Sequence, residues 1–163
     1  MDDLQKLNWF QGNGNKVEFT EIINICKKFV KKGSKIFIGT DSFKSKKSTN
    51  FATAICLYGI GNQSRYFYVK DRVSARKTHY NILSIRITEE ARRSVELAEH
   101  LTSNYSFKYE DIELHLDVSP LALKNGTSKL SDALTGYVVG AGFECRVKPE
   151  AWASQTVADK HSK

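Results

Sequence analysis

Three strand-like runs follow one another before the chain begins to alternate between helix and strand, and this order constrains the fold most. The runs at 35–41, 50–58 and 65–72 are rich in β-branched and aromatic residues. The links between them are short and either polar or glycine-containing, which is typical of hairpin connections. The three runs therefore predict an antiparallel meander.

The rest of the chain alternates helix with strand. Residues 88–103 predict a helix with Thr88 as its N-cap, and an amphipathic helix at 18–32 precedes the first strand. The remaining elements are strands at 112–118 and 143–148 and helices at 128–141 and 150–161. The order βββαβαβα, after an N-terminal helix, predicts an α/β fold with five strands in a mixed sheet and helices on both faces.

A chain of 163 residues is long enough for about one domain with a real core. We expect a loose arm over 1–15, so that residues 1–32 form an arm and helix packed on a domain at 33–163. No apolar run approaches the length of a membrane span, and the acidic, polar start does not resemble a secretory signal. Three widely spaced cysteines fit reduced thiols. We therefore expect a cytoplasmic protein.

The charge is unevenly distributed along the chain. The net charge is +7, and residues 1–86 contain 16 Lys and Arg against 6 Asp and Glu. Residues 87–163 contain 9 Lys and Arg against 12 Asp and Glu. A basic half joined to a mildly acidic half fits a polyanionic partner together with a local carboxylate cluster. A solvated basic surface is the plainer interpretation.

Three acids fall where this topology would bring them together. Asp41 ends the first strand and Asp117 ends the fourth, and ligand sites in parallel sheets lie at the carboxyl ends of strands. Glu90 lies on the apolar face of the helix at 88–103, whereas Glu89 and Arg93 fall on the face we expect to be solvated. Each acid alone also fits a structural role, in a turn or at a helix N-terminus.

A fourth acid is expected from the last helix. Asp159 is our first candidate, Glu150 at the helix start is its rival, and Asp132 in the preceding helix is a weaker one. Converging carboxylates without a His or Cys set suit hard cations, Mg²⁺ or Mn²⁺. Two such ions are able to hold a scissile phosphate, which would explain the acids and the basic half together.

Several stretches of this sequence resemble the ribonuclease H-like superfamily and, within it, the YkuK-type family of predicted nucleases. They are "IFIGTDS", "RITEEARRSVELA", "ELHLDVS", "GYVVGAGFECRVKPEAWAS" and "VADK". The resemblance implies a strand order of 3-2-1-4-5 and hydrolysis of phosphodiester bonds by a two-metal mechanism. It implies the acidic residues Asp41, Glu90, Asp117 and, less closely matched, Asp159 as catalytic metal ligands.

Basic residues around the first hairpin and after the third strand are candidates to hold phosphates of RNA, DNA or a hybrid. They are Lys44, Lys46, Lys47, Arg72, Arg76 and Lys77. Tyr66, Tyr68 or His79 would stack on bases. The main alternative is a catalytically inactive nucleic-acid-binding module. A nucleotide phosphotransferase and a serine hydrolase are weaker alternatives, because neither a phosphate-binding G-x-x-x-x-G-K-[ST] loop nor a G-x-S-x-G elbow occurs.

Overall fold

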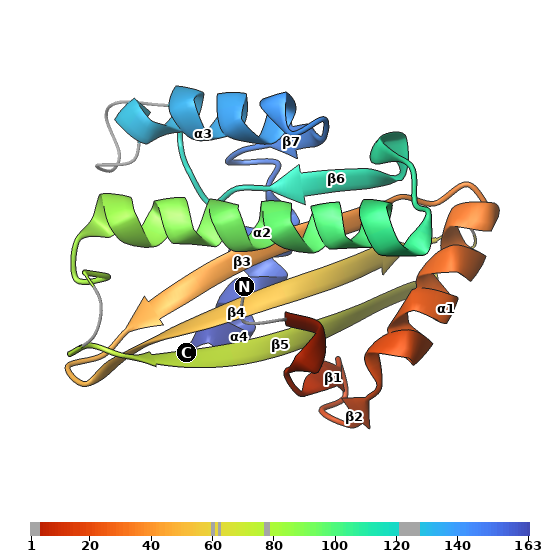
Figure 1. Cartoon of the computed structure of the whole chain (residues 1–163), viewed down its shortest axis with the longest axis horizontal. Helices are drawn as coiled ribbons and strands as arrows, with labels where there is room; N and C mark the ends of the chain where they lie inside the picture. Colours follow the sequence, from red (N-terminus) through yellow and green to blue (C-terminus); the bar gives the residue numbers. More distant parts are fainter. Residues whose placement is uncertain (1–3, 60, 62, 77–78, 121–127) are drawn as a thin grey trace.

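The structure, a computed structural model, describes residues 4–59, 61, 63–76, 79–120 and 128–163. One mixed sheet runs through it, with seven strands in the order β2-β1-β5-β4-β3-β6-β7 (Figure 1). The strands are β1 (Trp9–Gln11), β2 (Lys16–Val17), β3 (Ile36–Lys44), β4 (Ser48–Tyr58), β5 (Ser64–Ser74), β6 (Ile112–His115) and β7 (Glu144–Arg146).

The five expected strands are present in the expected relative order. Strands β3, β4 and β5 form the predicted antiparallel meander, and β6 pairs in parallel with β3 and with β7. The expected number of strands is wrong, because β1 and β2 form a hairpin that adds to the free edge of β5. The loose arm expected over 1–15 is therefore also wrong. Gly14, with a φ of 88°, supplies the turn.

Helices cover both faces of the sheet (Figure 1). One face carries α1 (Phe19–Lys31), α2 (Leu83–Tyr105) and α3 (Ser128–Gly140). The other face carries the π-helix η3 (Ala153–Ala158), which continues directly into α4 (Asp159–Ser162). Short 3₁₀ turns, η1 (Leu4–Lys6) and η2 (Tyr109–Asp111), precede β1 and β6.

Helix α2 begins earlier than the sequence indicates. Its first residue is Leu83, so Thr88 is not the N-cap, and the Thr88 hydroxyl instead donates to the Ser84 carbonyl at 2.8 Å. Leu83, Ile85 and Ile87 alternate with polar residues, a pattern that fits a strand as well as a helix, so the sequence alone does not assign this stretch. Glu90 consequently lies in the third turn of the helix, away from its N-terminus.

The side chains of β3 alternate between two hydrophobic clusters. Ile36 and Ile38 lie in the main core with residues of α1, α2 and α3. Phe37 packs on the opposite face with Trp152 and Ala153 of the C-terminal segment. Small residues line that face of the sheet, so the backbone of η3 lies directly on β3. A Cβ added to Gly39 would lie 2.5 Å from the Ser154 nitrogen.

Candidate metal and nucleic-acid site

Strand β3 is longer than its parallel neighbour β6, and this leaves one edge of β3 open. The pairing with β6 covers Ile36 to Gly39 only, whereas the pairing with β4 continues to Lys44. Beyond His115 the chain diverges from β3 but stays beside β7, since the Leu116 N–H donates to the Arg146 carbonyl at 2.9 Å. Residues 40–42 of β3 therefore lie beside the open end of the parallel part of the sheet, where ligand sites form.

Asp41 lies at this end of β3, on the face covered by the C-terminal segment. Its side chain is buried, and the Ser162 hydroxyl donates to its Oδ2 at 2.8 Å. Burial raises the pKa of Asp41 to about 6, against the lowering effect of the Ser162 hydrogen bond. The negative charges of Asp117 and Asp159 add to the rise, which places both acids near Asp41.

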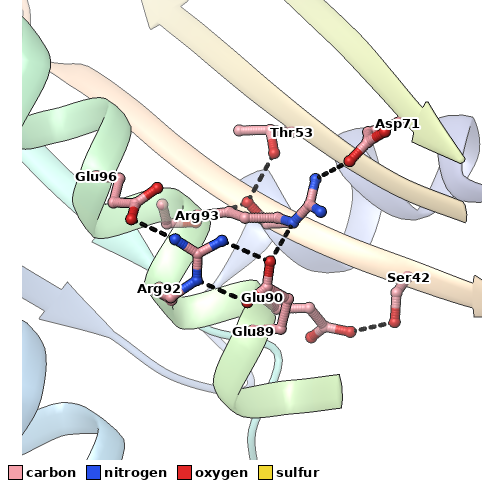
Figure 2. Close-up of polar contacts among 10 residues, drawn as sticks. Ser42, Thr53, Asp71, Glu89, Glu90, Arg92, Arg93 and Glu96 are labelled. Atoms are coloured by element: carbon pink, nitrogen blue, oxygen red, sulfur yellow. Dashed lines mark hydrogen bonds and ion pairs between the residues drawn. The ribbon is translucent and has the colours of Figure 1, made fainter. Parts of the chain in front are cut away.

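Glu90 reaches the same strand end from the other face of the sheet. Its side chain is buried, and the Ser42 hydroxyl donates to its Oε1 at 2.5 Å (Figure 2). Burial raises the pKa of Glu90 well above its ordinary value, with further contributions from the charges of Asp41 and Asp117. Ser42 follows Asp41 in the strand, so the two acids lie on opposite sides of one stretch of β3.

Asp117 and Asp159 each lie beside a lysine. The Oδ1 atom of Asp117 is buried and accepts no hydrogen bond within the described ranges, although the Lys148 ammonium lies 2.8 Å away as an ion pair. Asp159 pairs with Lys163 at 2.8 Å. Of the alternatives for a fourth acid, Glu150 and Asp132 are exposed, and neither is among the charges that shift the pKa of Asp41. The geometry thus favours Asp159 over both.

The four acids are electrostatically coupled but not in contact. Within the part of the chain that the structure describes, no three His, Cys, Asp or Glu side chains are grouped closely enough to hold one metal ion. The donor set is nevertheless chemically suitable, because buried carboxylates with raised pKa values favour a bound cation.

A second group of charges on α2 lies next to Glu90 and was expected to be surface charge. That expectation is wrong: Glu89 and Arg93 are both buried. Glu89 accepts hydrogen bonds from Arg92 at 2.7 Å and from Arg93 at 2.8 Å, and Arg92 also pairs with Glu96 (Figure 2). These hydrogen bonds and charges lower the pKa of Glu89 despite its burial.

Arg93 connects this group to the sheet. Its guanidinium pairs with Asp71 of β5 at 2.8 Å and lies over the Phe51 ring at 4.2 Å from the ring centroid. The interaction ties α2 to β4 and β5, so it fixes the rotation of the helix that directs Glu90 toward β3. We name the group Glu89, Arg92, Arg93, Glu96 and Asp71 the arginine cluster.

The predicted phosphate-binding residues lie at the same end of the meander as Asp41 (Figure 1). Lys44, Lys46 and Lys47 are exposed on the β3–β4 hairpin, and Arg72 and Arg76 are exposed at the end of β5 and just beyond it. Arg72 donates to the Ser48 hydroxyl at 3.0 Å, which connects the two strands. Lys77 lies outside the described residues.

Other side chains of the protein already pack against two of the rings proposed for base stacking. Tyr68 stacks on His161 of α4 with ring centroids 3.5 Å apart, and the His161 ring also contacts the Tyr66 hydroxyl. Phe67 is fully buried in the main core. His79 is exposed.

Sequence reasoning missed the hydroxyls of Ser42 and Ser162 that support this site. Ser42 is signalled by strand alternation, since a residue next to Asp41 must face α2. Ser162 has no such signal. His115 is buried; its Nδ1 accepts the Ala153 N–H at 3.0 Å, so its Nε2 carries the proton that is donated to Glu113. This contact positions the start of η3 on the sheet.

Fold and site together define a mixed α/β class in which acids lie near the end of a central strand. The sequence matches the Ribonuclease H-like family over residues 18–163, and the chain belongs to that family. It is 26% identical over 165 residues to "Uncharacterized protein YkuK" of Bacillus subtilis (strain 168), an alignment that covers 91% of this chain and 92% of that protein. No solved structure matches the chain.

Family membership suggests a nuclease or a nucleic-acid-binding role. It does not choose between them, because one fold carries many activities. Among the described residues, no helix is long and apolar enough to cross a membrane.

Proposed function

We propose that this protein is a Mg²⁺- or Mn²⁺-dependent nuclease that hydrolyses phosphodiester bonds of nucleic acid by a two-metal carboxylate mechanism. The observation that carries the proposal is the burial of Asp41 and Glu90 at the open end of β3, where the charges of neighbouring acids add to the rise in their pKa values. Buried carboxylates with raised pKa values destabilise the folded chain when they are ionised, unless a cation compensates them.

Asp41, Glu90, Asp117 and Asp159 would hold the ions in this proposal. When bound, such ions supply an activated water and stabilise the leaving oxygen of the phosphodiester. Asp41 approaches from the strand, Glu90 from α2 and Asp159 from α4, so three separate elements supply the ligands. Ser162 and Ser42 orient Asp41 and Glu90 through their hydroxyls. Lys148 and Lys163 form ion pairs with Asp117 and Asp159, and a bound metal ion would displace these lysines from the two acids.

The exposed lysines of the first hairpin would hold the substrate. Lys44 lies three residues beyond Asp41 on the same strand, about 10 Å along it at the usual rise per residue. Phosphates on either side of a bond cleaved at Asp41 would therefore meet Lys44, Arg72 and their neighbours. Such contacts position the strand without reading its sequence.

A cleavage assay with labelled RNA, DNA and RNA–DNA hybrid tests the proposal. We expect cleavage that requires Mg²⁺ or Mn²⁺, leaves 5′-phosphate and 3′-hydroxyl ends, and is lost in Asp41→Asn and Asp117→Asn. Asp132→Asn is the matched control, because Asp132 is an exposed acid of α3 outside the coupled group. Cleavage undiminished in both site variants would refute the assignment of the site.

The second candidate is a binding module without catalysis. It is favoured by the two lysines that already neutralise Asp117 and Asp159, and by the spacing of the acids, which among the described residues is too wide for a three-ligand metal centre. Salt-sensitive binding of nucleic acid without cleavage at any concentration of Mg²⁺ or Mn²⁺ would support it. Calorimetric titration with Mn²⁺ separates the two, since only the nuclease requires ions at Asp41.

A further inference from the structure

Two neighbouring cavities lie at the start of β5, at the opposite end of the meander from Asp41. The first has a volume of about 460 Å³ and the second about 560 Å³. Both are within the size range of small-molecule sites. The two cavities lie on opposite faces of the sheet, and because Ser64 and Arg65 line both, they meet around the first residues of the strand.

The first cavity is aromatic. It lies between the C-terminal segment and the sheet, and its lining is largely apolar, with four rings, those of Phe37, Tyr58, Tyr66 and Trp152. Phe37 of β3 packs against Trp152 with ring centroids 5.0 Å apart, and Tyr66 of β5 contributes to the same hydrophobic cluster. Trp152 and Tyr66 are only partly buried, so ring surface remains open to a planar ligand.

The second cavity is basic. It lies between α1 and the start of β5, and its charged lining residues are Lys28, Lys32 and Arg65. None of the described residues that line either cavity is acidic. The Arg65 guanidinium is held in place by a hydrogen bond to Gln11 at 3.2 Å and lies 5.5 Å from the Phe67 ring centroid. It has further N–H donors to offer an anion.

We infer that these two cavities form one binding site for a nucleotide unit of single-stranded nucleic acid, with the base in the aromatic cavity and a phosphate in the basic one. A planar ring joined to an anionic group at short range is the ligand chemistry that this juxtaposition fits. Aromatic stacking combined with a cationic groove is how proteins bind single strands without sequence preference. The site goes beyond the proposed function, since it requires no metal and no cleavage.

The distance between this site and Asp41 would give the site a role in selecting substrates. Phe37 and Asp41 lie four residues apart on β3, about 13 Å at the usual rise. A strand bound at Asp41 would thus reach the aromatic cavity within a few nucleotides. The cavity needs an unstacked base, so the site would select substrates with a single-stranded segment at that distance from the cleaved bond.

Trp152 fluorescence in the full chain, with EDTA present, provides the test. The only other tryptophan, Trp9, is buried on the opposite side and donates to the Leu4 carbonyl. We expect saturable quenching by adenosine 5′-monophosphate and weaker quenching by adenosine. Arg65→Gln and Lys28→Gln should each weaken the monophosphate about fivefold to tenfold, a typical loss for one phosphate contact.

Two further variants keep the test decisive. Ser64→Glu changes an exposed residue shared by both cavities and should abolish monophosphate binding by repulsion while the protein remains folded. Lys31→Gln removes an exposed charge of α1 that lines neither cavity and should change nothing. The absence of saturable quenching, or equal affinities for adenosine and its monophosphate in every variant, would overturn the inference. Asp41→Asn should bind normally, which separates this site from the nuclease proposal.

Discussion

Glu89 and Glu90 are adjacent on one helix and equally buried, yet the protein treats them in opposite ways. Glu89 is surrounded by two arginines, which lower its pKa. Glu90 accepts a hydrogen bond from one hydroxyl, and its burial together with the charges of Asp41 and Asp117 raises its pKa. The two arginines compensate the negative charge of Glu89 inside the protein. The negative charge of Glu90 is left uncompensated, which is typical of a site that binds a ligand.

The largest effect should come from Glu90. Glu90→Gln keeps the size of the side chain and removes the charge, so the proposed nuclease should lose about a thousandfold in cleavage rate, equivalent to about 4 kcal/mol of transition-state stabilisation. Thermal unfolding in EDTA should show the variant at least as stable as the original chain, since a buried uncompensated charge is gone. A clear loss of stability would mean that Glu90 is as fully compensated as its neighbour.

The same substitution one residue earlier should act on stability. Glu89→Gln removes one of the two carboxylate partners of the buried Arg93, which costs about 3 kcal/mol of unfolding free energy in urea titration. Cleavage by the variant that remains folded should persist. Glu99→Gln is the matched control, because Glu99 is exposed on the same helix and its change should have little effect. Equal losses in the two variants would remove the distinction between the neighbouring glutamates.

The pH dependence of stability should differ between the two regions. Without metal, Asp41 holds a proton in the folded chain up to about pH 6, whereas the unfolded chain loses it near 3.8. The folded state therefore binds more protons in this window, and stability falls as pH rises through it, by about 3 kcal/mol for the full shift. Glu89 acts with the opposite sign and below its ordinary value of 4.5.

Urea titrations from pH 4.5 to 7 in EDTA would measure this slope. Asp41→Asn should flatten it and raise stability at neutral pH. Added Mn²⁺ should stabilise the original chain at pH 7 and leave the variant less affected, because a ligand of the folded state shifts the unfolding equilibrium. Because the pKa of Glu90 is also raised, part of the slope should remain in Asp41→Asn, and a slope that is unchanged would assign the proton uptake to groups other than Asp41.

The smallest effect should come from the hydroxyl that accompanies Glu90. Ser42→Ala removes the one hydrogen bond that lowers the pKa of Glu90, so that pKa should rise further. The acid limb of the cleavage pH profile should move to higher pH, and the rate well above it should change little. The folded state should lose about 1 kcal/mol, the usual worth of one hydrogen bond. Thr88→Ala, on the exposed side of α2, is the control.

The meander followed from the sequence because strand alternation and helical period leave few topologies open, and the same periods put Asp41 in β3 and Glu90 on the sheet-facing side of α2. The β1–β2 hairpin did not, since strands of three and two residues carry no usable period. The arginine cluster was missed for another reason. Helical period predicts which face meets the core, but the reach of Arg93 to Asp71 and Phe51 depends on how α2 lies across the sheet.

The contacts of the C-terminal segment could not be predicted from the sequence either. Ser162 meets Asp41 across 121 positions of the chain, a separation at which no local pattern acts. The identity of the fourth acid depended on the same placement. Glu150 matched the family pattern better, but η3 and α4 place Asp159 near Asp41 and leave Glu150 exposed.

The close approach of η3 to Gly39 has a consequence for when the site comes into existence. Asp41 is synthesised early, but Ser162 and Asp159 reach it only after residues 153–162 have emerged from the ribosome and settled onto the bare backbone of β3. A nascent chain shorter than this would hold the lysines of the β3–β4 hairpin before its full acid set. If the protein is the nuclease proposed above, such a chain would be able to attach to nucleic acid during synthesis without being able to cut it.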